Sequence, residues 1–327
     1  MGTAALLLAL LGACATGRAT PAADPGDTTA TTTGTGATAG DGAPAAGGIS
    51  LGNPDLVPDD HTGPYAALGT VLQSPDHGPQ LCHAVATSYP PQCSGLDLAG
   101  WDWAALPAGS HESQNGTTWG DFVVVGTLAG TTEQDGTLTL TEPPRLPGDA
   151  GDLLPVARDP AAGFDSPCPE PAGGWRAPDP ARATEETLQA ALTRAERLDG
   201  YGGSWIDAPP VSGEPRPDPE DDPALDPANQ VLNVSTTGDV AAAEQALREV
   251  WGGPLCVSTA RRAYADLLTV QADLDRREGL LQSSIDVVTG EVVGYFLVAR
   301  QSLQEELDAT HGAGVVRLEA VLHPVRG

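Results

Sequence analysis

The stretch that decides the first half of the fold reads Trp119-Gly120-Asp121-Phe122-Val123-Val124-Val125-Gly126-Thr127-Leu128. In an extended strand, successive side chains point to opposite faces. Phe122 and Val124 therefore point to one face, and Val123 and Val125 point to the other. A run that is apolar on both faces is typical of a strand that is buried on both sides or that closes a barrel.

Four more short β-rich runs surround this stretch, and turn signals such as Gln134-Asp135-Gly136 separate them. The five expected strands are Ala67–Leu72, Gln80–Val85, Leu96–Trp103, Trp119–Leu128 and Thr137–Glu142. Their number and spacing predict a small all-β domain, a barrel or a sandwich, over residues 55–145. An OB-like barrel would fit, although such a fold does not by itself imply nucleic-acid binding.

Helical and extended patterns alternate over residues 179–327, which predicts an α+β domain. We expect a first helix capped by Asp179, with Pro180 in its first turn, that ends at Gly200. Another expected helix is capped by Thr259 and runs to Arg277. The remaining elements are strands at 201–206, 230–235, 254–258 and 315–322, a hairpin at 280–288 and 291–299, and helices at 239–251 and 302–310. This order favours an α+β sandwich with ferredoxin-like β-α-β units, and no internal repeat stands out.

Two proline-rich segments interrupt the globular regions. Residues 146–178 are expected to form a linker between the two domains, and residues 207–228 an exposed acidic loop. The carboxylates of that loop lack the D-x-D-x-D-G spacing that wraps a calcium ion. A solvated loop is therefore the preferred interpretation.

An export signal occupies the start of the chain. The apolar run Ala4–Ala13 has about half of the ~20 residues that a membrane-spanning helix needs, which suits the core of a signal peptide. Leu11-Gly12-Ala13 before Cys14 resembles a bacterial lipobox, which makes residues 1–13 the signal peptide. Cys14 would be the residue modified with lipid, including acyl chains such as palmitate. The first residues carry no Lys or Arg, which a start codon placed too far downstream would explain.

Two alternatives to lipidation remain for this segment. An ordinary signal peptidase could cut after Ala13-Cys14-Ala15 and release a soluble secreted protein, or the run could belong to a core element. Residues 14–54 carry no large apolar side chain before Ile49, so they cannot bury enough surface to fold. We expect a disordered tether that joins the lipid to the folded part.

The cysteine count agrees with export. Without Cys14, four cysteines remain, as an oxidising compartment favours. We favour Cys82–Cys93 and Cys168–Cys256, because each pair then falls within one expected domain. The other connectivities, buried free thiols and a zinc site are the alternatives. Zinc is the weakest of them because no C-x-x-C spacing occurs.

The net charge of −28, with arginine as the only basic residue type among 16, argues against nucleic acid as a partner. None of the six histidines has metal-ligand spacing, and no G-x-S-x-G elbow or cofactor motif is present. We therefore expect no cofactor and no metal. Among 44 acidic residues, no pair can be singled out as a catalytic acid and base.

The pair Trp101 and Trp103 is the most distinctive candidate for ligand binding. Both rings would share one face of a strand and could form a platform for a sugar or wall polymer. Packing in the core is the competing explanation, and we favour it, because aromatic residues supply much of the buried area of a small core.

Several stretches carry a wider resemblance: GPQLCHAVATSYPPQCSGLDLAGWDW, CPEPAGGW, GYGGSW, GPLCV and the ending HGAGVVRLEAVLHPV. Together they resemble a family of uncharacterised actinobacterial surface proteins over most of residues 65–327. The resemblance implies an envelope location and paired cysteines, and it carries no activity.

The sequence thus predicts a lipid-anchored protein on the extracytoplasmic face of the cell membrane. We expect a non-enzymatic role in which its surface binds a ligand, a wall component or a protein partner. A wall-associated hydrolase that uses paired carboxylates is the alternative.

Overall fold

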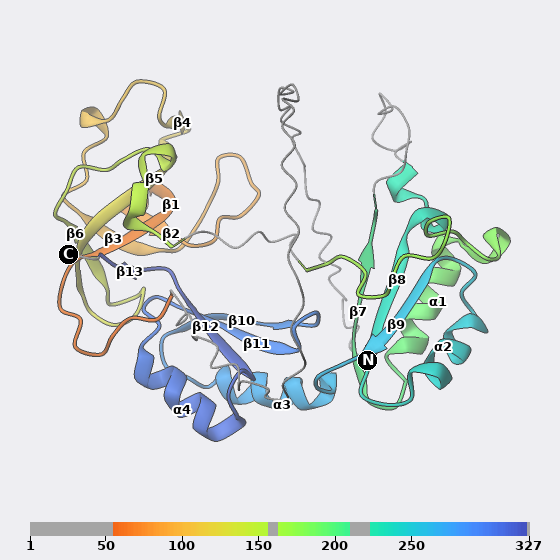
Figure 1. The fold of residues 1–327 in the computed structure, drawn as a ribbon. Helices are drawn as coiled ribbons and strands as arrows, with labels where there is room; N and C mark the ends of the chain where they lie inside the picture. The colour runs from red at the N-terminus through yellow and green to blue at the C-terminus, as the bar shows by residue number, and fades with distance from the viewer. Residues whose placement is uncertain (1–54, 156–162, 210–222, 326–327) are drawn as a thin grey trace, which may run out of the picture. The chain divides into compact units, whose positions relative to one another are not determined.

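The fold is mixed α+β in the computed structural model, which describes residues 55–155, 163–209 and 223–325 (Figure 1). Cys14, the tether and residues 210–222 of the acidic loop lie outside the described residues. No helix in the described ranges is long and apolar enough to cross a bilayer.

Five strands form a small closed barrel, and they correspond to the five strands predicted from the sequence. They are β1 (Tyr65–Ser74), β2 (His77–Cys82), β3 (Leu96–Ala99), β5 (Thr117–Ala129) and β6 (Thr137–Leu140). Neighbours follow the order β1-β2-β3-β6-β5, and β5 pairs back onto β1 to close the barrel. One short exposed strand, β4 (Glu112–Gln114), extends the edge of β5 and was not predicted.

Burial on both faces of β5 confirms its predicted role. Phe122 and Val124 point into the barrel core, whereas Val123 and Val125 are buried on the outside. There the chain returns over them, with backbone hydrogen bonds between Val123 and Arg145 and from Thr141 to Val125. Gly126 allows β6 to approach closely, because a Cβ atom at this position would collide with the Thr139 carbonyl oxygen.

The end of the chain completes the barrel. Leu297 and Leu322 are fully buried in the same hydrophobic cluster as the barrel interior. The last strand, β13 (His323–Pro324), pairs with the beginning of β1. The barrel therefore depends on residues from both ends of the described chain.

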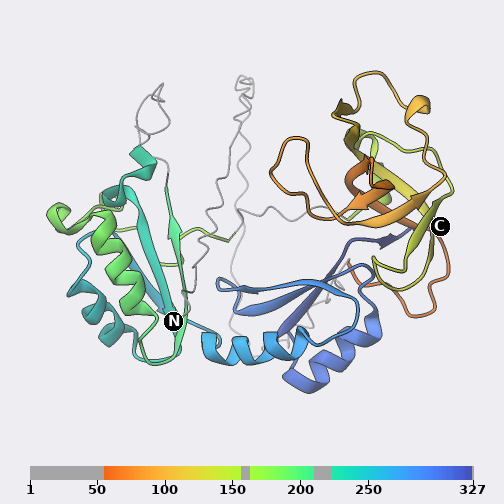
Figure 2. The same ribbon diagram turned by 180° about the vertical axis from the view of Figure 1, so that it is seen from behind.

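The remaining elements form two modules of the same α-β-β-α-β order (Figure 2). The first module comprises α1 (Glu185–Ala195), β7 (Tyr201–Asp207), β8 (Val231–Thr236), α2 (Val240–Arg248) and β9 (Leu255–Thr259). The second comprises α3 (Tyr264–Leu274), β10 (Leu280–Asp286), β11 (Glu291–Phe296), α4 (Gln301–His311) and β12 (Val316–Ala320). In each module both helices pack on one face of a three-stranded sheet.

Strand pairing is the same in the two modules. In each sheet the first two strands are antiparallel, and the register shifts after the first residue pair, Tyr201 with Thr236 and Leu280 with Phe296. In both modules the second and third strands are parallel. Their first residue pairs are Leu232 with Leu255 and Val292 with Val316. The structure thus contains an internal repeat that did not stand out in the sequence.

The repeat is hard to see in the sequence because its backbone is retained while most side chains differ. The connection within the first hairpin spans residues 208–230, whereas the second hairpin turns within residues 287–290. Buried Leu188 and Leu267 are among the few equivalent positions that carry the same residue.

Several element boundaries differ from the prediction, and three of them have a clear local cause. Asp179 precedes a short 3-10 turn, η4 (Pro180–Arg182), and α1 instead begins after Thr184, whose side chain forms a capping box with Thr187. The helix ends at Ala195 and does not reach Gly200 as predicted. Thr259 ends β9, and α3 begins after Ala263. β3 ends at Ala99, because Gly100 turns the chain with a positive φ of 85°.

Asp59 caps α4 from a distant part of the sequence. Its carboxylate accepts hydrogen bonds from the backbone N–H of Ser302 at 3.1 Å and from the Ser302 hydroxyl at 2.6 Å. Asp59→Ala should lower the free energy of unfolding by about 1 kcal/mol, because a free N–H group at a helix N-terminus is left without its acceptor. Urea denaturation of the variant measures the loss.

Asp60→Ala serves as the matched control, since Asp60 is also exposed and has no partner among the described residues. Equal destabilisation by the two substitutions would contradict the capping role of Asp59.

Candidate functional site

Two disulfides join the four cysteines that the structure describes, and they are the two pairs favoured from the sequence. Cys82 and Cys93 have Cα atoms 6.0 Å apart, and Cys168 and Cys256 have theirs 5.8 Å apart. In the described ranges, no group of three or more His, Cys, Asp or Glu side chains could hold a metal ion. Because Cys82 is oxidised, it has no thiol that could act with the neighbouring His83.

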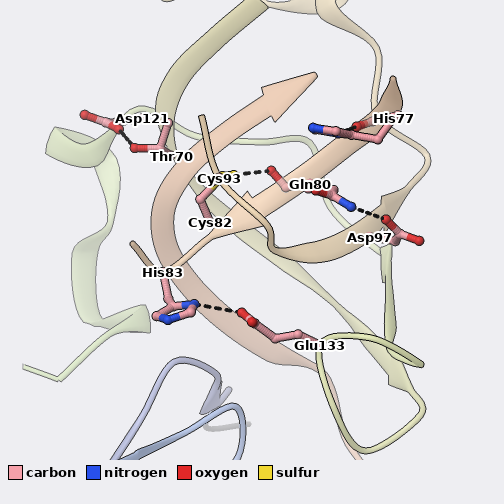
Figure 3. Close-up of a disulfide and its surroundings, with 10 residues drawn as sticks. Thr70, His77, Gln80, Cys82, His83, Cys93, Asp97, Asp121 and Glu133 are labelled. Carbon is pink, nitrogen blue, oxygen red and sulfur yellow. Dashed lines mark hydrogen bonds and ion pairs between the residues drawn. A yellow bond between two sulfur atoms is a disulfide. The ribbon is translucent and has the colours of Figure 1, made fainter. Parts of the chain in front are cut away.

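Polar contacts hold the base of the Cys82–Cys93 loop on the barrel, as Figure 3 shows. The His83 imidazole lies with its Nδ1 atom 2.8 Å from Oε1 of Glu133. This hydrogen bond raises the pKa of His83. Nearby, the Gln80 amide donates to Asp97 at 3.0 Å and links β2 to β3. These contacts hold the loop and the strands beside it in place.

Trp101 and Trp103 pack against the barrel core. Both follow β3 instead of lying within it, so they do not share a strand face as predicted. The two rings meet edge to face, with centroids 5.1 Å apart and an angle of 73°, and both contact Phe122. The Trp103 indole donates to Gln73 at 2.8 Å. Both side chains are half-buried, and their edge-to-face geometry offers no common flat surface to a sugar ring.

A cavity of about 200 Å³ lies on the sheet of the first module. Leu232 and Val234 of β8 pack against the helices, so Ser235 points to the opposite face. The cavity lies on this opposite face, near the carboxyl ends of the parallel strands β8 and β9. Its polar lining residues are Asp165, Ser235, Ser258, Thr259, Arg261 and Arg262, and Trp205 supplies the largest apolar wall.

The space exists because a row of small residues crosses the sheet. Gly203, Ser235 and Ser258 are paired in register across β7, β8 and β9. The equivalent row of the second module consists of Gln282, Tyr295 and Glu319. The same backbone therefore has larger side chains where the first module has the cavity.

Charged side chains also occupy the corresponding face of the second module. Arg317 on β12 donates to Glu291 at 3.2 Å and is bound by Glu319. The position on β9 that is equivalent to Arg317 holds Cys256, whose side chain forms the disulfide with Cys168. On this face of the sheet, the described residues therefore leave open polar space in the first module and fill it in the second.

Fixed contacts surround the cavity. The Trp205 indole donates to the Phe164 carbonyl at 3.0 Å, and the Ser166 N–H donates to Asp207 at 2.9 Å. Together with the Cys168–Cys256 disulfide, these bonds hold residues 163–168 over the sheet. On the other side, Arg262 donates to the Gly290 carbonyl at 2.8 Å and holds the turn between β10 and β11.

That turn fits closely against β7. Gly203 has a φ of 149°, and a Cβ atom there would lie 2.5 Å from Cβ of Val287. A glycine is therefore required at this end of the cavity. The lining residues come from five separate stretches of sequence.

In a second cavity, of about 290 Å³, two of the three charged side chains among the described lining residues have other partners. Arg300 in its lining donates to the Pro58 carbonyl and to the Tyr65 hydroxyl. Glu306 binds Arg277 at 2.6 Å, and Glu278 is the other carboxylate. This cavity offers fewer free polar groups than the cavity of the first module.

Sequence reasoning did not single out Arg261 and Arg262. The available signal was an adjacent arginine pair in a strongly acidic chain, shortly after the hydroxyl residues Ser258 and Thr259.

No family model matches the chain, and no curated protein is similar enough to count as a relative.

The His83–Glu133 pair should make stability depend on pH. A histidine whose pKa is raised on folding stabilises the fold below its unfolded pKa of about 6.5. This stabilisation is lost as the pH rises through the higher pKa of the folded state. His83→Gln should therefore lower the free energy of unfolding by up to about 1 kcal/mol at pH 5.5 and have less effect at pH 8.5. Urea denaturation at both pH values measures this.

Glu133→Gln is the matched variant and should reproduce the same pH dependence, because it removes the other member of the pair. A loss that is equal at the two pH values would contradict this account.

Proposed function

We propose that this protein is a lipid-anchored extracytoplasmic envelope protein that binds a small ligand in the cavity of the first module and has no catalytic role of its own. The observation that carries the binding role is the cavity itself. Hydroxyl and guanidinium groups converge there on a space that the sister module fills with side chains.

The two disulfides support an extracytoplasmic location, because such bonds persist in oxidising compartments. The lipobox-like sequence before Cys14 supplies the proposed anchor. A wall component or a protein could supply the ligand group, and the strongly negative charge of the chain disfavours nucleic acid.

At the level of fold, we propose an OB-like barrel followed by ferredoxin-like units. Closure of five strands and the parallel pairing of β3 with β6 support the first assignment. The β-α-β connection within each module supports the second. Neither assignment carries the functional proposal, since folds of both kinds serve many roles.

Lipidation is tested by comparing the full chain with its Cys14→Ser variant in a bacterial host that processes lipoproteins. We expect the wild-type protein in the membrane fraction, with a mature N-terminus at Cys14 that carries the mass of a lipid. The variant should leave this fraction. A mature wild-type chain that begins at Cys14 without added mass would contradict the anchor.

Ligand binding is tested with the oxidised Cys14→Ser chain, in which the lipid is removed and the cavity is unchanged. We expect at least one compound in a panel of neutral sugars, amino acids, inorganic anions and divalent cations to raise the melting temperature. A ligand that binds only the folded state stabilises it by mass action. Differential scanning fluorimetry measures the shift.

Ser235→Tyr is the specificity control, because it places in the cavity the residue that the second module carries at the equivalent position. The near-ultraviolet circular dichroism spectrum checks that this variant folds. An unchanged response in a folded Ser235→Tyr protein would contradict binding in this cavity, as would the absence of any response in the parent chain.

A further inference from the structure

We infer that the cavity of the first module binds a small oxyanion, a carboxylate or phosphate group, through Arg261 and Arg262. This inference rests on the proposed function, because it names the chemical class of the ligand for the same site. It follows from the charge of the lining, from the hydroxyl groups around it and from the size of the space.

Arg261 and Arg262 bring positive charge to the cavity without a carboxylate partner. Neither forms an ion pair with another residue in the part of the chain that the structure describes. Arg182, Arg248 and Arg300 also lack one there, but their guanidinium groups donate to backbone carbonyls outside this cavity. In a chain with a net charge of −28, acidic partners are abundant. Two adjacent arginines that line a cavity without one are therefore available to bind an anion.

The guanidinium of Arg262 is already oriented. One of its terminal nitrogens donates to the Gly290 carbonyl at 2.8 Å, which limits the conformations of the side chain. A guanidinium has five N–H donors in a planar fork, so most remain free for a ligand. This fork matches the paired oxygens of a carboxylate or phosphate.

Hydroxyl groups add neutral donors. Ser258 and Thr259 line the cavity, and Ser235 also lines it, although its hydroxyl donates to the Gly203 carbonyl at 3.5 Å. A hydroxyl can donate one hydrogen bond, so Ser258 and Thr259 can add donors to those of the guanidinium groups.

The size and remaining charge of the cavity limit what can bind. A volume of about 200 Å³ is below the 300–1,000 Å³ that is usual for drug-sized ligands. Asp165 is the one carboxylate among the described lining residues, and it is exposed at the rim. Its negative charge should weaken the binding of a free anion. Replacing Asp165 with a neutral residue should therefore strengthen binding, whereas removing an arginine should weaken it.

The test uses the full, oxidised Cys14→Ser chain, titrated separately with sodium phosphate and sodium acetate at constant ionic strength by isothermal calorimetry. Binding of either salt is expected. Arg261→Gln should weaken binding at least tenfold, and Asp165→Asn should strengthen it. Arg261 is exposed and holds no other residue in the described structure, so its removal should leave the fold intact. Arg276→Gln, which removes another exposed arginine, should have no effect.

The two titrations separate the sources of the oxyanion: preference for acetate favours a carboxylate-bearing ligand, and preference for phosphate favours a phosphoryl group. Equal weakening by Arg261→Gln and Arg276→Gln would overturn the inference, because it would indicate attraction to net charge alone. The absence of binding by either salt would also overturn it.

Failure of this inference can be distinguished from failure of the proposed function. If a neutral sugar or a cation stabilises the chain and Ser235→Tyr abolishes the effect, the cavity is a ligand site and the oxyanion assignment is wrong. If no compound in the panel stabilises the chain, both are wrong.

Discussion

The pairing of β5 with β1 is the interaction on which the rest of the structure depends. It runs without interruption from Tyr65 with Gly126 to Gln73 with Thr118, and it turns an open sheet into a closed barrel. Closure removes the sheet edges and encloses one apolar cluster. Leu297 and Leu322 enter that cluster from the second module, so closing the barrel also provides a packing surface for the end of the chain.

Repetition of one module explains how a site can arise on a common backbone. Both modules satisfy their backbone hydrogen bonds in the same way and bury equivalent positions such as Leu188 and Leu267. The faces opposite the helices are therefore free to differ. In the second module that face is filled by Tyr295 and an arginine with its carboxylate partners, whereas in the first it consists of small polar residues around a cavity.

Much of the local structure could be predicted from the sequence. Short β-rich runs separated by turn signals located all five barrel strands, and the order of helices and strands from β7 to β12 was also correct. The helix starts at Asp179 and Thr259 were wrong, because a residue suited to capping can equally begin a short turn or end a strand. Trp101 and Trp103 are half-buried and pack against the barrel core, and their predicted position in a strand was wrong.

By itself, the sequence determined the strongly acidic charge, the elements of secondary structure and the favoured cysteine pairs. These depend on composition, on periodicity and on short spacings along the chain. Only the tertiary structure decided the closure of the barrel, the repetition of the modules and the convergence of Trp205, Ser235 and Arg262 on one cavity. These properties depend on strand register and on contacts between distant residues, which no local pattern specifies.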